Sequence, residues 1–160
     1  MGGNHMNKNM LKKPKSVLCY TDLSKNSSYL VRYAYEISKM LEAELFVLHN
    51  VTDIKGAAGF YVPHINMDKL EEEVIQAARD KIYAICHQAV GDSIDKVHRI
   101  VIRGGLIEAL EQVIRERKIG LVIMPHDGDK GILSWFRGDY AERFLRDASI
   151  PFLVLPMDAR

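Results

Sequence analysis

The chain has 160 residues, of which 48% are hydrophobic and 27% are charged. This length and composition are typical of one globular domain with a sizeable core. The formal net charge of +1 gives no electrostatic reason to expect a nucleic-acid or anionic-membrane partner. No apolar run approaches the roughly 20 residues of a membrane span, and no apolar signal segment opens the chain. We therefore expect a cytoplasmic protein.

The N-terminal segment, residues 1–13, is polar and begins with MGGNH, in the form of an expression-vector remnant. We expect it to be disordered and the folded domain to span residues 14–160.

Cys19 lies in a strand pattern and Cys86 in a helical one, and neither has a CxxC partner. Two reduced, buried thiols are therefore expected.

The first half of the chain alternates strand and helix patterns. The apolar run Ser16–Tyr20 predicts a strand that ends at the turn-rich stretch TDLSKNS. Residues 27–43 carry apolar side chains at helical spacing, with Asn26 or Ser27 available as the N-cap. The nearly continuous apolar run Glu44–Val51 is typical of a strand buried on both faces.

A long connection, residues 52–66, comes next, and its length indicates a functional or mobile segment. A long helix is predicted over Met67–Val90, with Asn66 or Asp68 as its cap. Its apolar face is expected to consist of six residues: Leu70, Val74, Ala77, Ala78, Ile82 and Ile85.

The second half continues the alternation. It predicts a strand at 96–104, a helix at 106–119, a strand at 120–124, a helix at 138–148 and a strand at 151–156. Strands that alternate with helices indicate right-handed βαβ units and a parallel sheet covered on both faces. Ligands bind such sheets beyond the carboxyl ends of the strands. We therefore expect the turns after the first, second and fourth strands to meet at one edge.

The most informative motif follows the fourth predicted strand. A glycine-containing loop opens at Pro125, includes Gly128, and reaches a helix start at Gly138 and Asp139. Glycines let the backbone approach a ligand closely, and a helix N-terminus attracts anions. The layout is therefore that of a phosphate-binding loop.

From about residue 15 to residue 156, the chain resembles the universal stress protein family. The family motif is Gly, two residues, Gly, nine residues, then Gly and Ser or Thr. The same spacing falls here on Pro125, Gly128, Gly138 and Asp139. The stretches YTDLSKNS and AERFLRDASIPFLVLP are also similar to family segments. The resemblance implies one flavodoxin-like (Rossmann-like) α/β domain with a five-stranded parallel sheet, strand order 3-2-1-4-5 and helices on both faces.

Two departures from the family motif affect phosphate binding. Pro125 has no N–H, so the loop loses one donor. Asp139 is expected as an N-cap, with Glu142 completing a capping box, and it occupies helix donors that a phosphate needs. At about 4 Å and a dielectric constant of 20, like unit charges repel by roughly 4 kcal/mol. Lys130 and Arg137 could still reach phosphates, and Asp139 could face a bridging Mg²⁺. We nevertheless expect the triphosphate site to be disabled.

The resemblance implies a candidate nucleotide site that is degenerate at its phosphate end. Its residues are Asp22, Asn50, Met124, Gly128, Lys130, Gly138 and Asp139. Asp22 either faces a base or ribose or, with Ser24, forms the turn and cap of the first helix. Asn50 stands where ATP-binding members tend to carry an apolar residue. Binding of a nucleoside, a monophosphate or another small ligand is an alternative that the sequence leaves open.

The chain shows neither metal-ligand histidine spacing nor a GxSxG elbow, so no catalytic residue and no metal ligand is assigned. The sequence favours a non-enzymatic stress-response or regulatory module without a firm cofactor, acting through protein contacts. The alternative is a family member that binds ATP or AMP, with weak or no hydrolysis. A small-molecule site formed by residues 52–66 is a weaker third hypothesis. An exposed apolar edge strand needs a partner, so a homodimer through residues 152–156 is expected. A further protein partner, which the sequence does not identify, is an additional expectation.

Overall fold

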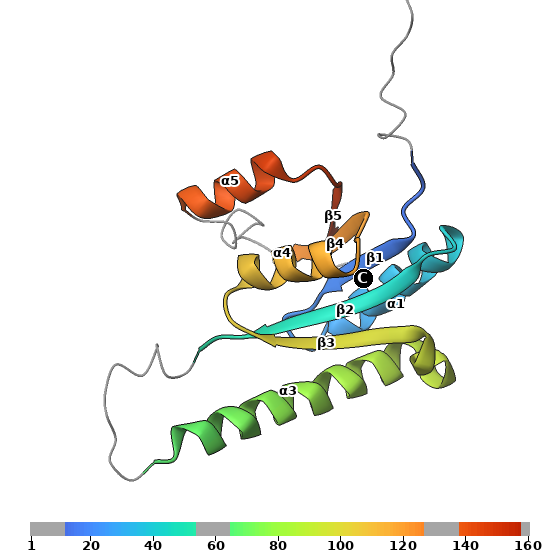
Figure 1. Ribbon diagram of the computed structural model, residues 1–160. Coiled ribbons are helices and arrows are strands. Elements are labelled where there is room, and N and C mark those ends of the chain that lie inside the picture. Colours follow the sequence, from blue (N-terminus) through green and yellow to red (C-terminus); the bar gives the residue numbers. More distant parts are fainter. Residues whose placement is uncertain (1–11, 54–64, 127–137, 158–160) are drawn as a thin grey trace, which may run out of the picture.

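The computed structural model describes residues 12–53, 65–126 and 138–157, and strands and helices alternate along them (Figure 1). The strands are β1 (Ser16–Tyr20), β2 (Glu44–Val51), β3 (Val97–Arg103), β4 (Leu121–His126) and β5 (Phe152–Pro156). The helices are α1 (Ser27–Met40), α3 (Met67–Val90), the 3-10 helix η1 (Gly91–Lys96), α4 (Leu106–Glu116) and α5 (Asp139–Asp147).

The five strands form one parallel sheet in the order β3-β2-β1-β4-β5. Leu18 of β1 pairs with Phe46 of β2 on one side and with Val122 of β4 on the other. From β1 the chain adds β2 and β3 on one side and then β4 and β5 on the other, so the strand order reverses between β1 and β4. The predicted α/β fold and strand order are therefore confirmed, and parallel strands bring all five carboxyl ends to one edge.

Each face of the sheet is covered by helices because successive side chains of a strand point to opposite faces. Val17 and Cys19 of β1 belong to a core cluster with residues of α1 and α3. Leu18 and Tyr20 belong to a second cluster with residues of α4, and Phe144 of α5 packs against it. Figure 1 shows the same arrangement, with α3 and α4 on opposite sides of the sheet.

Both cysteines are free and buried in the α1–α3 side of the core, as predicted. Burial raises the pKa of the Cys86 thiol to about 12 and raises that of Cys19 further. Both thiols therefore stay protonated near neutral pH, in the form that is a weak nucleophile.

Two helices end three residues earlier than the sequence pattern predicts. Glu42 and Lys118, just beyond α1 and α4, have φ angles of 53° and 51°. The next residue in each case donates its N–H back five positions, to the carbonyl of Ser38 at 2.8 Å or of Ile114 at 3.1 Å. These are Schellman-type endings, which usually carry glycine at the left-handed position.

The predicted apolar face of α3 is only partly buried. From Ala78 onward the predicted residues are buried, but Leu70 and Ala77 are exposed and Val74 is half-buried. The 24 residues of α3 extend about 36 Å at 1.5 Å per residue. The eight residues of β2 extend only about 26 Å. The first turns of α3 therefore lie beyond the strand ends (Figure 1).

Candidate functional site

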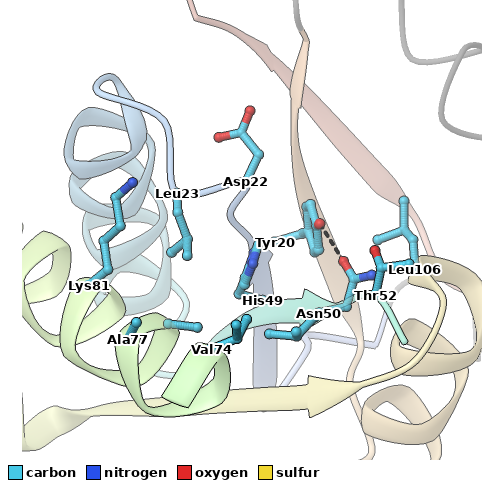
Figure 2. Close-up of a pocket in the computed structure, with 12 residues that line it drawn as sticks. Tyr20, Asp22, Leu23, His49, Asn50, Thr52, Val74, Ala77, Lys81 and Leu106 are labelled. Atoms are coloured by element: carbon cyan, nitrogen blue, oxygen red, sulfur yellow. Dashed lines mark hydrogen bonds between the residues drawn. The ribbon is translucent and has the colours of Figure 1, made fainter. Parts of the chain in front are cut away.

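A cleft of about 740 Å³ opens at the carboxyl ends of β1 and β2, the edge at which the sequence predicts ligand binding (Figure 2). Its volume lies within the range of small-molecule sites. The residues that line it are Tyr20, Asp22, Leu23, His49, Asn50, Val51, Thr52, Val74, Ala77, Ala78, Lys81 and Leu106.

The cleft straddles the end of the sheet and therefore has two different halves. His49 lies in the half next to α3, whose wall includes Val74, Ala77 and Lys81 (Figure 2). Asn50, the next residue along β2, lies in the half toward α4, beside Tyr20. The apolar residues of α3 that no strand covers thus form a wall of the cleft.

A hydrogen-bonded chain of three residues ties the ends of β1, β2 and β3 together. The Tyr20 hydroxyl donates to Oδ1 of Asn50 at 2.6 Å, and Nδ2 of Asn50 donates to the Gly104 carbonyl at 3.0 Å. Gly104 has a φ of 133°, which favours glycine. Burial, and secondly the Asp22 carboxylate, raise the pKa of Tyr20. The phenol therefore stays protonated and remains a donor.

His49 connects β2 to the turn after β1. Its Nδ1 lies 2.8 Å from the carbonyl oxygen of Thr21. A carbonyl can only accept, so Nδ1 carries the proton and Nε2 is an acceptor in the neutral ring. The imidazole also lies beside the Tyr20 ring, with 6.3 Å between the ring centroids.

Asp22 organises the turn that leads into α1. Its Oδ1 accepts from the Ser24 N–H at 2.9 Å and from the Ser27 hydroxyl at 3.2 Å. The Asn26 side chain, at the N-cap position, makes no capping hydrogen bond. Asp22 also lines the cleft, so the two roles that the sequence left open for it are compatible.

Of the residues predicted for the phosphate end, the three that the structure describes, Met124, Gly138 and Asp139, do not line the cleft. Met124 is 0% exposed and lies in the core cluster on the α4 side. Pro125 is a buried residue of β4, paired with Leu155. Gly128 and Lys130 lie outside the described residues. Of the predicted site, the structure brings Asp22 and Asn50 together at one cleft.

The expectation that Asp139 caps α5 was wrong. The N-cap is Gly138, with a φ of 100° and no side-chain capping bond, and Asp139 is the first helical residue. The carboxylate of Glu142 pairs with Arg146 at 3.1 Å rather than closing a capping box. Asp139 still places a negative charge in the first turn, where the helix dipole favours it.

Sequence reasoning missed Tyr20, His49 and Lys81. His49 and Asn50 interrupt an otherwise apolar strand at its carboxyl end, and that break is a signal for a site. No comparable sequence signal marks Lys81.

Among the described residues, no group of three or more His, Cys, Asp or Glu is placed to hold a metal ion. In the same ranges, no helix has the length and apolarity that a membrane crossing requires.

Both the sequence and the fold resemble those of known proteins. The sequence model of the Universal stress protein family matches residues 13–156. No curated protein sequence is significantly similar to the chain. The fold is similar to that of a protein from the universal stress protein family of Burkholderia pseudomallei. The two are 22% identical, with a TM-score of 0.59, over 89% of this chain and 96% of that chain.

Two similar structures contain nucleotides. A universal stress protein in complex with cAMP is 18% identical, with a TM-score of 0.54, over 92% of this chain and 100% of that chain. One from Archaeoglobus fulgidus in complex with dAMP is 11% identical, with a TM-score of 0.53, over 89% and 98% of the two chains. At these identities the structural comparisons establish the shared fold.

The turn role of Asp22 predicts a loss of stability when its acceptor oxygen is removed. Asp22→Ala should lower the free energy of unfolding by about 1 kcal/mol, because the Ser24 and Ser27 donors lose their partner. Asp22→Asn keeps an acceptor and should recover most of that loss. Urea unfolding followed by circular dichroism measures both variants. Equal stability of Asp22→Ala and wild type would show that the turn does not depend on this carboxylate.

Proposed function

This chain belongs to the universal stress protein family, and on that basis we propose that it is a non-catalytic cytoplasmic stress-response module that binds an adenine nucleoside monophosphate. The proposed site is the cleft at the carboxyl ends of β1 and β2. In this proposal ATP is not bound tightly, and the bound state is transmitted through protein contacts.

The observation that carries the proposal is the composition of the cleft. Val74 and Ala77 offer an apolar wall to a planar ring, while Asp22 and Asn50 offer acceptors to hydroxyl and amino groups. Lys81 supplies one positive charge, which suits one phosphate. The cAMP and dAMP bound by two proteins of the same fold each carry one adenine and one phosphate.

The segment after β4 opposes tight ATP binding. Pro125 cannot donate a backbone hydrogen bond. Asp139 brings a carboxylate to the first turn of α5, where the family motif has Ser or Thr. Such a charge opposes a triphosphate electrostatically. A Mg²⁺ ion between the carboxylate and the phosphates would reverse this effect, so the metal is included in the test.

Binding without catalysis fits the hydrogen bonds in the cleft. The Asp22 carboxylate accepts from Ser24 and Ser27, and the His49 Nδ1–H is committed to the Thr21 carbonyl. These contacts hold the polar groups in positions that suit ligand recognition. They do not form a nucleophile paired with a general base.

Titration calorimetry with AMP and ATP, each with and without Mg²⁺, tests this function. We expect wild type to bind AMP more tightly than ATP. Pro125→Gly combined with Asp139→Ser should raise ATP affinity about tenfold or more, because it removes the repulsion and restores a donor. Asp147→Ser, at the other end of α5, is the matched control and should leave ATP affinity unchanged.

Two results would contradict the proposal. Micromolar ATP binding by wild type in the presence of Mg²⁺ would make Asp139 a metal-side residue and refute the closed phosphate end. Absence of heat with both nucleotides would refute nucleotide binding altogether.

We also propose that the chain forms a homodimer through β5. This strand is an edge of the sheet, and Leu153 on it is 37% exposed. Tyr29 and Tyr33 of α1 are exposed beside a hollow of about 110 Å³ that they share with the end of β5 and Met157. An apolar edge of this kind favours pairing with another strand.

A charge on the edge strand should disrupt this dimer. We expect wild type to elute as a dimer and Leu153→Lys as a monomer, because an edge lysine opposes strand pairing. Light scattering after size exclusion measures the mass. Met40→Lys, a change at an exposed apolar residue near the end of α1, is the control. A monomeric wild type, or a dimeric Leu153→Lys, would contradict the proposed interface.

A further inference from the structure

The Asn50 amide is fixed in one orientation at both of its ends. The Tyr20 hydroxyl donates to Oδ1, and Nδ2 donates to the Gly104 carbonyl. The carbonyl can only accept, so the end of the amide that faces Gly104 must be the nitrogen. Rotating the amide by 180° would place two acceptors, Oδ1 and the Gly104 oxygen, against each other. The structure therefore permits one orientation.

The two contacts leave part of the amide available to a ligand. A primary amide has two N–H donors and two lone pairs on its oxygen. Within the described part of the chain, one N–H and one lone pair are used by Gly104 and Tyr20. The half-buried Asn50 side chain lines the cleft (Figure 2). It can therefore offer one donor and one acceptor, in a fixed order.

We propose that Asn50 selects a 6-aminopurine over a 6-oxopurine, with Tyr20 as the residue that positions it; this inference rests on the nucleotide binding proposed above. Adenine presents an amino donor at C6 next to a ring-nitrogen acceptor. That pattern is complementary to an asparagine amide, which pairs with adenine in the same way in DNA recognition. Hypoxanthine presents an oxygen at C6, which would face the Asn50 oxygen.

The fixed orientation is what produces the selectivity. A freely rotating amide could turn its nitrogen toward a 6-oxo group and accept either base. Here that rotation would lose the hydrogen bond to the Gly104 carbonyl, set two acceptors against each other, and require the Tyr20 hydroxyl to accept instead of donate. A site whose polar groups are already oriented discriminates against ligands that leave those groups unpaired. Because Asn50 is half-buried rather than sealed from water, we expect a preference of about tenfold.

The test compares AMP with IMP, which differ at C6 and keep the same ribose and phosphate. Calorimetry on wild type should show AMP binding about tenfold more tightly than IMP. Asn50→Val should bring the ratio of the two affinities close to one. Tyr20→Phe removes the donor to Oδ1 and leaves Gly104 alone to hold the amide, so it should reduce the ratio in part while AMP binding itself persists.

Control variants separate a positioning role from a general loss of structure. Tyr83→Phe removes an exposed phenol hydroxyl from α3 outside the cleft and should keep the wild-type ratio. Thermal unfolding reports whether each variant is folded. If Asn50→Val does not fold, Tyr20→Phe is sufficient as the test. Its readout is the ratio of the AMP and IMP affinities, in which a general loss of affinity cancels.

The two proposals fail in distinguishable ways. Equal binding of AMP and IMP by wild type would overturn the selective role of Asn50 and leave nucleotide binding intact. An unchanged preference in both Asn50→Val and Tyr20→Phe would do the same. A wild type that binds neither nucleotide would overturn both proposals.

Discussion

All five strands run in one direction, and the cleft depends on this constraint. Side chains within the strands alternate between two helix-covered faces, so polar groups are costly there and are concentrated where the strands end. Tyr20, Asn50 and Gly104 come from the ends of three neighbouring strands and are joined by hydrogen bonds. The parallel sheet thus both brings these groups together and fixes their orientation.

The length of α3 supplies the second feature of the cleft. A helix that is longer than the strands it packs against cannot bury its whole apolar face, and the uncovered part lies beside the strand ends. Val74 and Ala77 therefore form a wall of the cleft instead of part of the core. An apolar surface on one side of the strand ends, with fixed polar groups on the other side, is suited to a flat, partly polar ligand such as a purine.

Strong periodic patterns made the fold predictable from the sequence. The strands and helices followed from apolar runs and helical spacing, and the strand order from the family resemblance. The helix ends after Met40 and Glu116 could not be read, because Glu42 and Lys118 adopt left-handed angles without being glycine. The position of Asp139 was also missed, since Gly138 at a φ of 100° takes the N-cap position.

The site was only partly predictable. The turn after β1 and the end of β2 are marked by polar residues, so Asp22 and Asn50 could be named. Lys81 and the α3 wall depend on how far the helix extends past the sheet, which is a property of tertiary packing. The Tyr20–Asn50 contact joins residues 30 positions apart, and neither residue alone indicates the other.

We propose that a nucleoside monophosphate occupies the cleft at the ends of β1 and β2. The most direct measurement is a titration of ¹⁵N-labelled protein with AMP, followed by amide chemical shifts. We expect the largest changes at residues 20–23, 49–52 and 104–106, with smaller ones along α3 near Ala77 and Lys81. Changes confined to β5 and α1, or none at millimolar AMP, would contradict binding in this cleft.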